Sequence, residues 1–215
     1  MCPDGEPTER ILMIERDVLY RCREEHKKMF QVGETVVYGT TGVCTILSIG
    51  PLSMHGVDRH RLYYTLQPLH QEGAIYIPVE GEHHKAMRYP ITEEAAEQLV
   101  ERLAEIPPCD IEGLNFKQRT DAFTATLQAA DCEGWLGVIK AVAKKKRFRR
   151  EKQQYNVDYN FYKKAMKLLC MELGYVLHKS DDSMRKLIED CLAQAAREAK
   201  EARAAEMAET EDEEA

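Results

Sequence analysis

Basic side chains with an aromatic residue among them form the densest cluster of potential chemistry in the sequence. The stretch "KKKRFRREKQQY" (144–155) holds six Lys/Arg in the seven residues 144–150. Six like charges repel one another unless an anionic partner is present, and phosphates are the usual partners. The run and the lysines that follow it predict a phosphate-binding face, whose members include Lys144, Lys145, Arg147, Arg149 and Lys163. The alternative is a solvated helix end, where the negative pole of the helix dipole favours two or three of the charges.

The second candidate is an aromatic residue at the start of an expected helix. Asn115 and Phe116 are followed by Lys117 and Arg119. An aromatic ring beside cations can insert at a base step or stack on an unpaired base. These residues therefore predict contact with nucleic acid, and the alternative is an ordinary core aromatic. Trp135, which has apolar residues at helical spacing after it, is predicted to lie in the core.

The patterns of the common enzyme and metal sites are missing from the sequence. There is no phosphate-binding G-x-x-x-x-G-K-[ST] loop, no G-x-S-x-G elbow and no H-E-x-x-H zinc motif. His83-His84 and the pair His55 and His60 have no cysteine nearby at zinc-site spacing, so we expect solvent-facing turn histidines. The sequence predicts neither an enzyme nor a cofactor.

The charge distribution and the cysteines indicate the cellular compartment of the protein. The net charge of −7 averages a basic segment, 117–167, with 13 Lys/Arg against 5 Asp/Glu, and an acidic tail, 189–215, with 3 against 10. The seven cysteines are odd in number and contain no C-x-x-C pair. Such a set, with no apolar run of membrane-spanning length and no apolar core of a secretory signal, predicts a reduced cytoplasmic protein.

The expected secondary structure changes from strands to helices near residue 91. Residues 29–91 read as four or five short strands separated by glycine-rich turns, which is typical of a small barrel. Gly39 and Gly42 are expected where the chain reverses with positive φ. From Thr92 onward the spacing is helical, with expected helix starts at Thr92, near Asn115, at Asp131 or Glu133, at Asn156 or Asp158, and at Ser180, and with Pro107-Pro108 ending the first helix. The predicted class is α+β, in two domains.

The predicted organisation has four parts. Residues 1–28 are a leader, either disordered or an extension ahead of an alternative start at Met29, with a docking helix as the competing interpretation. Residues 29–91 form the barrel, 92–192 a helical domain, and 193–215 an acidic tail that is helical or disordered.

The strand segments resemble a known family. "MFQVGETVVYGTTGVCTILSI", "YYTLQPL" and "IYIPVE" are similar to the N-terminal module of the CarD/CdnL bacterial transcription regulators, which also occurs in transcription-repair coupling factors. "NFKQRTDAFTATLQAAD" stands where the family has an Asn-aromatic pair followed by a basic helix start. The resemblance covers roughly residues 29–192.

The resemblance implies a fold and partners. In the family a Tudor-like barrel binds the β subunit of RNA polymerase, and a helical domain contacts promoter DNA at the upstream edge of the melted bubble. A tryptophan there wedges into the minor groove and stabilises the open complex. That wedge position is Phe116 here, with Asn115 before it and Lys117 and Arg119 after it. The positions implied for polymerase contact are Leu52, Tyr76 and Pro78.

Together, the sequence predicts a monomeric, nucleoid-associated transcription regulator that bridges RNA polymerase and promoter DNA. One alternative is a polymerase-binding adaptor whose helical domain holds another protein. A third class compatible with the sequence is a hydrolase with an unidentified Cys/His pair.

Overall fold

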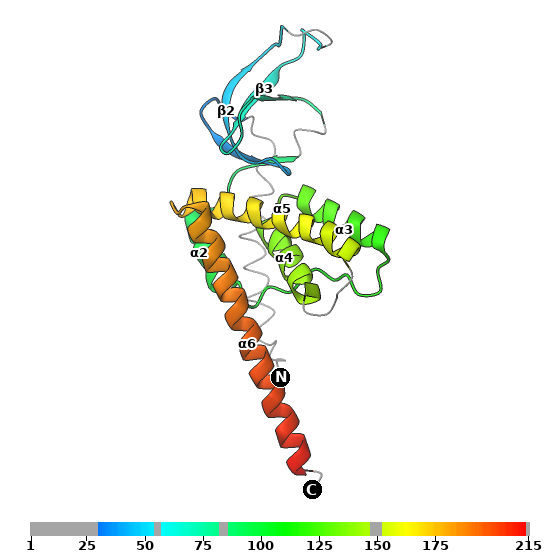
Figure 1. Ribbon diagram of the computed structural model, residues 1–215. Coiled ribbons are helices and arrows are strands. Elements are labelled where there is room, and N and C mark those ends of the chain that lie inside the picture. The colour runs from blue at the N-terminus through cyan, green and yellow to red at the C-terminus, as the bar shows by residue number, and fades with distance from the viewer. Residues whose placement is uncertain (1–29, 54–56, 82–85, 147–151, 214–215) are drawn as a thin grey trace, which may run out of the picture. The chain divides into compact units, whose positions relative to one another are not determined.

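The chain divides into two compact units, residues 1–91 and 92–215. The computed structural model describes residues 30–53, 57–81, 86–146 and 152–213, so the predicted leader at 1–28 lies outside the described residues. Within the described residues, the first unit contains strands and the second contains helices (Figure 1). The expectation of a β unit followed by a helical unit is confirmed.

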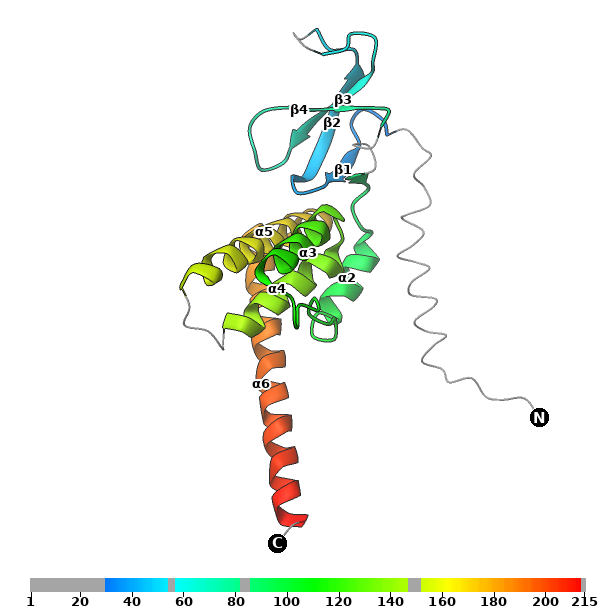
Figure 2. The ribbon, with the colours of Figure 1, turned by 90° about the vertical axis from the view of Figure 1, so that its right-hand side faces the viewer.

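The first unit is a curled antiparallel sheet with the spatial order β4-β3-β2-β1-β5, and Figure 2 labels β1 to β4. Its strands are β1 (Thr35–Tyr38), β2 (Gly42–Gly50), β3 (Tyr63–Pro68), β4 (Ile75–Pro78) and β5 (Met87–Arg88). The first four follow one another as a meander, and the total of five lies within the four or five strands predicted. The position of the short β5 was not predicted, and it pairs with β1 through Val37 and Arg88. The sheet therefore has β4 at one edge and β5 at the other.

The turn between β1 and β2 has the backbone that its glycines predicted. Gly39 has φ of 42° and Gly42 has φ of 90°, both in the region that side chains with a Cβ rarely adopt. The amide of Thr41 donates to the carbonyl oxygen of Tyr38 at 2.9 Å. This tight reversal sets Tyr38 opposite Gly42 and brings β1 and β2 into register.

Aromatic and aliphatic side chains fill the concave side of the sheet. Val36, Ile46, Tyr64 and Ile77 are almost completely buried there. Phe30 meets the Tyr64 ring edge-on, with ring centroids 6.1 Å apart. Because alternate side chains of a strand point to opposite faces, the residues between these core positions lie on the outer face.

The second unit consists of helices that begin largely where the capping residues predicted. They are α2 (Glu93–Glu101), α3 (Phe116–Gln128), α4 (Cys132–Lys146), α5 (Lys152–Val176) and α6 (Asp181–Glu213). Thr92 caps α2 by accepting from the amide of Ala95, and the hydroxyl of Ser180 accepts from the amide of Ser183 at the start of α6. For α4, Asp131 accepts from the amide of Gly134 at 3.0 Å.

Two predicted helix boundaries are wrong. Helix α5 begins at Lys152, so Asn156 and Asp158 lie inside it and neither is its cap. Asp158 instead points into the unit, where it is buried beside Arg119. Helix α2 ends at Glu101, ahead of Pro107, where a series of turns replaces its last predicted turn.

The core of the second unit lies between α4 and the helices around it. Trp135 is fully buried, as predicted, and its indole N–H donates to the carbonyl oxygen of Leu127. The segment after α2 is fastened to α4 because the Lys140 ammonium donates to the carbonyl oxygens of Ala104 and Ile106. That anchor fixes the connection leading to α3.

Candidate functional site

Phe116 is the first residue of α3, and a capping box sets the position of that helix start. The Asn115 side chain accepts from the amide of Gln118, and the Gln118 side chain accepts from the amide of Asn115, both at 3.0 Å. Such reciprocal bonds satisfy two amides that the helix itself leaves unpaired. The Phe116 side chain is 44% exposed. The alternative interpretation of Phe116 as a core aromatic is therefore wrong.

Arg119 lies beneath this ring and does not face solvent. It is 4% exposed, and its Nε donates to Oδ1 of Asp158 on α5 at 3.1 Å. Its Cζ lies 5.6 Å from the centroid of the Phe116 ring. The expectation that Arg119 reaches a phosphate needs correction in this structure, because Asp158 and Phe116 already enclose its guanidinium.

The other residues of the first turn of α3 create a positive potential that favours the binding of an anion. Lys117 is exposed, and the turn contains no acidic residue. The N-terminal pole of a helix carries a partial positive charge, to which Lys117 adds. Asn115 is exposed as well, although its side chain is engaged in the capping box. The start of α3 thus combines an exposed ring with a positive potential.

Three lysines of α5 form a second basic surface. Lys163, Lys164 and Lys167 are all exposed. The ammonium of Lys163 lies 5.0 Å from the ring centroid of Tyr159. Five residues of helix turn Lys163 by about 140° from Asp158, which faces α3. The structure therefore does not bring Lys163 to the side of α5 that meets Phe116.

The densest basic run is only partly within the described residues. Lys144 and Lys145 lie in the last turn of α4, and their side chains are not among those described. Arg147 and Arg149 fall in 147–151, outside the described residues. The phosphate-binding role of these four residues stays a prediction.

On the first unit, the predicted polymerase-contact residues lie toward one edge of the sheet. Tyr76 of β4 is 43% exposed and stands opposite Thr65 of β3. Pro78 at the end of β4 pairs with Tyr63, which also pairs with Gly50 at the end of β2. Leu52, half-buried, comes two residues after Gly50. The paired residues Gly50, Tyr63 and Pro78 thus form one row across β2, β3 and β4. Pro78 belongs to this row, Tyr76 lies two residues before it on β4, and Leu52 follows the end of β2.

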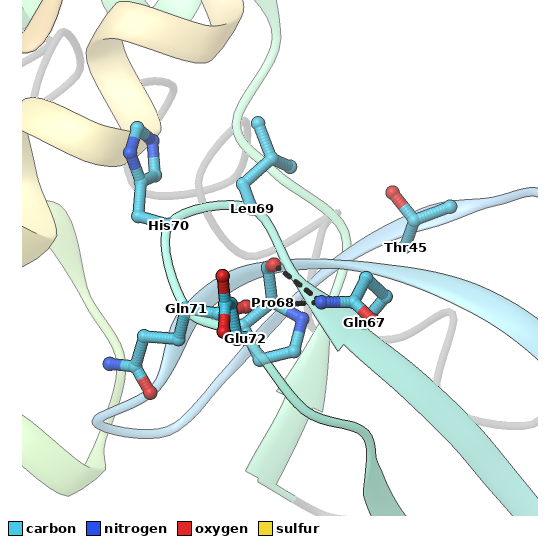
Figure 3. Close-up of a pocket in the computed structure, with 7 residues that line it drawn as sticks. All are labelled: Thr45, Gln67, Pro68, Leu69, His70, Gln71 and Glu72. Atoms are coloured by element: carbon cyan, nitrogen blue, oxygen red, sulfur yellow. Dashed lines mark hydrogen bonds between the residues drawn. The ribbon is translucent and has the colours of Figure 1, made fainter.

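A shallow hollow lies elsewhere on this unit, around the turn after β3 (Figure 3). It is lined by Thr45, Gln67 and the turn residues 68–72. The side-chain amide of Gln67 donates to the backbone carbonyl oxygens of Pro68 and Gln71, at 3.3 and 3.0 Å. This amide stabilises the turn that forms one side of the hollow.

The described part of the chain contains neither a candidate metal centre nor a helix that could span a membrane. In residues 30–53, 57–81, 86–146 and 152–213, no group of three His, Cys, Asp or Glu side chains could hold a metal ion. Nor does any helix within those ranges have the length and apolar character needed to cross a bilayer.

The sequence reasoning missed one residue of the α3 site, Asp158. Its position inside a helical run made it look like a cap, whereas its carboxylate pairs with an arginine 39 residues earlier. The local sequence signal for this buried pair was the position of Asp158 itself, an acidic residue among the aromatic residues 155, 159, 161 and 162.

Comparison with known proteins agrees with the arrangement of the first unit. Residues 30–90 match the family model described as the CarD-like/TRCF RID domain, where RID denotes an RNA polymerase-interacting domain. This family is an interaction domain and not a catalytic one. The matched segment ends before α2, so the predicted likeness of the helical part is not covered by it. No curated protein matches the chain. Residues 30–90 are therefore similar to the CarD-like/TRCF RID domain, which suggests an interaction with RNA polymerase.

Proposed function

We propose that this protein is a transcription regulator that holds RNA polymerase with its first unit and promoter DNA with its helical unit. The family match over residues 30–90 is the observation that carries the proposal. The polymerase surface is the β subunit, and the first unit acts as a Tudor-like module. The DNA contact lies at the upstream edge of the transcription bubble, where it stabilises the open complex.

The sheet offers a suitable contact for the polymerase at β4. Among the described strands, β4 pairs only with β3, so its other side is an open edge. Tyr76 exposes an aromatic ring beside that edge, and aromatic residues are enriched in protein interfaces. Leu52 and Tyr76 are uncharged, so packing contributes more than charge to this proposed interface.

The start of α3 is the proposed DNA contact. Phe116 supplies an exposed ring for stacking at the edge of the bubble, and Lys117 supplies a cation for the adjacent phosphate. The lysines of α5 and the basic run after α4 add attraction to DNA that does not depend on sequence. Binding the open complex more tightly than the closed one shifts the equilibrium by the difference in affinity.

The buried position of Arg119 supports one alternative, an adaptor whose helical unit binds another protein. With Arg119 enclosed and Lys163 turned away, fewer cations converge around Phe116 than the sequence predicted. An exposed aromatic residue with one neighbouring cation is also compatible with a protein interface.

A test of the proposal uses the full chain, purified polymerase and a promoter fragment. Tyr76→Glu should abolish capture of polymerase by the immobilised protein, because it places a charge on the contact surface. Leu69→Glu is the matched control, since Leu69 belongs to the same unit and is similarly exposed but lies in the turn after β3 and not on β4. Equal capture by both variants would contradict the assignment of β4.

The DNA contact is tested by footprinting the polymerase on the promoter. Addition of the protein should extend protection at the upstream edge of the bubble, and Phe116→Ala should remove that extension while polymerase capture persists. Polymerase capture without any added protection of DNA would favour the adaptor.

A further inference from the structure

The surface of Phe116 that faces the protein rests on a charged group. The Arg119 guanidinium lies with its Cζ 5.6 Å from the ring centroid, within the range of a cation–π contact. That guanidinium is held in turn by Asp158, 3.1 Å from Nε. Ring, guanidinium and carboxylate thus form one chain of contacts from the surface of α3 to the buried side of α5.

One nitrogen of the Arg119 guanidinium lacks a hydrogen bond to the described residues. Nη2 of Arg119 is buried and has no hydrogen-bond acceptor among the described residues. Buried donors are normally paired, so a buried exception calls for an explanation. The aromatic face of Phe116 offers a weak acceptor to such an N–H group, and a planar guanidinium packs well against it.

The ion pair also joins two helices at the site. Arg119 belongs to the turn that begins at Asn115, and its own amide donates to the Asn115 carbonyl oxygen at 3.0 Å. One turn further along α3, the ring of Phe123 packs 5.3 Å from that of Phe161 on α5. The start of α3 is therefore fixed to α5 both by the ion pair and by the aromatic contact.

We propose that Arg119 and Asp158 are positioning residues that present Phe116 for base stacking and make no contact with the DNA backbone. The guanidinium supports the ring from the protein side, Asp158 holds the guanidinium, and the exposed surface of the ring is left for a base. This inference rests on the proposed DNA contact of the helical unit.

A phosphate-binding arginine would contribute to the salt dependence of DNA binding, whereas a positioning arginine should affect only the stacking of a base on Phe116. The Arg119–Asp158 pair is neutral as a unit, so its removal should leave the salt dependence of DNA binding unchanged. Each phosphate contact, in contrast, contributes a slope of about 0.9 to the logarithmic plot of affinity against salt. Lys117, exposed in the same turn, should contribute to that slope without supporting the ring.

The experiment uses the full chain and a forked DNA with 2-aminopurine at its first unpaired position, whose fluorescence is quenched by stacking. The main variant is Arg119→Met/Asp158→Leu, which replaces the pair with apolar side chains of similar volume and keeps the net charge. Arg119→Lys is the second variant, which keeps the charge and loses the flat support. Lys117→Met is the matched control, and the melting temperature of each variant reports its folding.

Both pair variants should reduce quenching and weaken binding to the fork by roughly 5-fold or more, the lower end of stacking losses. Their salt slope should equal that of the parent. Lys117→Met should do the opposite, lowering the slope by about 0.9 and leaving quenching intact. Unchanged quenching in Arg119→Lys and the double variant, or a double-variant slope lowered by about 0.9, would overturn the proposal.

A measurement without DNA distinguishes this proposal from the proposed function. With 4-fluorophenylalanine at position 116, the fluorine resonance should move toward the value of the free amino acid in the double variant and in Arg119→Lys. A resonance that stays at its parent position in both variants would show that the pair does not support the ring. If Phe116→Ala itself leaves the quenching unchanged, the proposed DNA role fails, and the fluorine shift alone decides the positioning role.

Discussion

Replacing Phe116 with alanine should weaken DNA binding while destabilising the helical unit less than the loss of a core aromatic residue would. Phe116 is 44% exposed, so a little more than half of its surface is buried. Full burial of such a side chain stabilises a protein by about 1.5–3 kcal/mol, and Phe116→Ala should therefore cost about 1–1.5 kcal/mol in the free energy of unfolding. Phe123, two turns along the same helix, is 1% exposed, and Phe123→Ala should cost about 3–5 kcal/mol.

The unfolding assay can be confined to the helical unit. The chain has one tryptophan, and Trp135 is buried between the helices, so its fluorescence during urea denaturation reports on this unit. The binding assay is the lifetime of polymerase–promoter open complexes after addition of a competitor. Loss of base stacking costs about 1–3 kcal/mol, which shortens the lifetime roughly 5- to 150-fold if all of it appears in dissociation.

Two results would refute this reasoning. One is an unfolding free energy that falls as far in Phe116→Ala as in Phe123→Ala, because the ring would then be part of the core. The other is an unchanged lifetime of the open complex, because the exposed ring would then have no role in DNA binding. Phe116→Trp should preserve or lengthen the lifetime, since an exposed site accepts the larger ring.

Three further predictions concern stability. His178 is exposed and has φ of 53°, so His178→Gly should raise the melting temperature of the helical unit by about 2–4 °C, and His178→Val should lower it. A Cβ on Gly174 would lie 2.8 Å from the carbonyl oxygen of Lys179, so Gly174→Ala should destabilise the unit by about 1–3 kcal/mol, and a higher melting temperature would contradict this. Burial raises the pKa of the Cys44 thiol from 9.0 to about 12, so its contribution to stability is complete below pH 9 and is lost as the pH rises toward 12. Urea denaturation followed by circular dichroism should show the parent losing about 1.4 kcal/mol per pH unit above pH 9 relative to Cys44→Ala, and parallel curves would refute it.

Signals carried by neighbouring residues were enough to predict much of the secondary structure. Thr92, Asn115 and Ser180 marked the starts of three helices because a cap acts on amides only two or three residues away. Gly39 and Gly42 likewise marked a turn whose backbone requires positive φ. The exposure of Phe116 was left open, because its position at the start of a helix is compatible with either face.

Contacts between distant segments could not be predicted in the same way. The burial of Arg119 depends on a carboxylate 39 residues later, and the two basic residues after Phe116 gave no indication of it. The orientation of Lys163 depends on which side of α5 meets α3, and that is decided by packing. The two residues of β5 are too few to produce an alternating pattern, and they become a strand only by pairing with β1.

The strand order 4-3-2-1-5 also determines when each edge of the sheet is covered as the chain is synthesised. The three hairpins join strands that are consecutive in the chain, and each can close as soon as its second strand has emerged. The pairing of β1 with β5 must instead wait for Met87 and Arg88. Closing that loop costs about 2.5 kcal/mol more than closing the three-residue turn between β1 and β2, from the ratio of loop lengths.

Of the three strands that end with partners on both sides, β1 therefore waits longest for its second partner during folding. Its sequence, TVVY, is apolar and rich in β-branched residues, and such an edge readily pairs with another chain. A fragment that stops before residue 87 would leave that edge open permanently, so fragments of the first unit should include β5 to remain monomeric. The two-residue strand β5 thus covers the edge of β1 and prevents that edge from pairing with another chain.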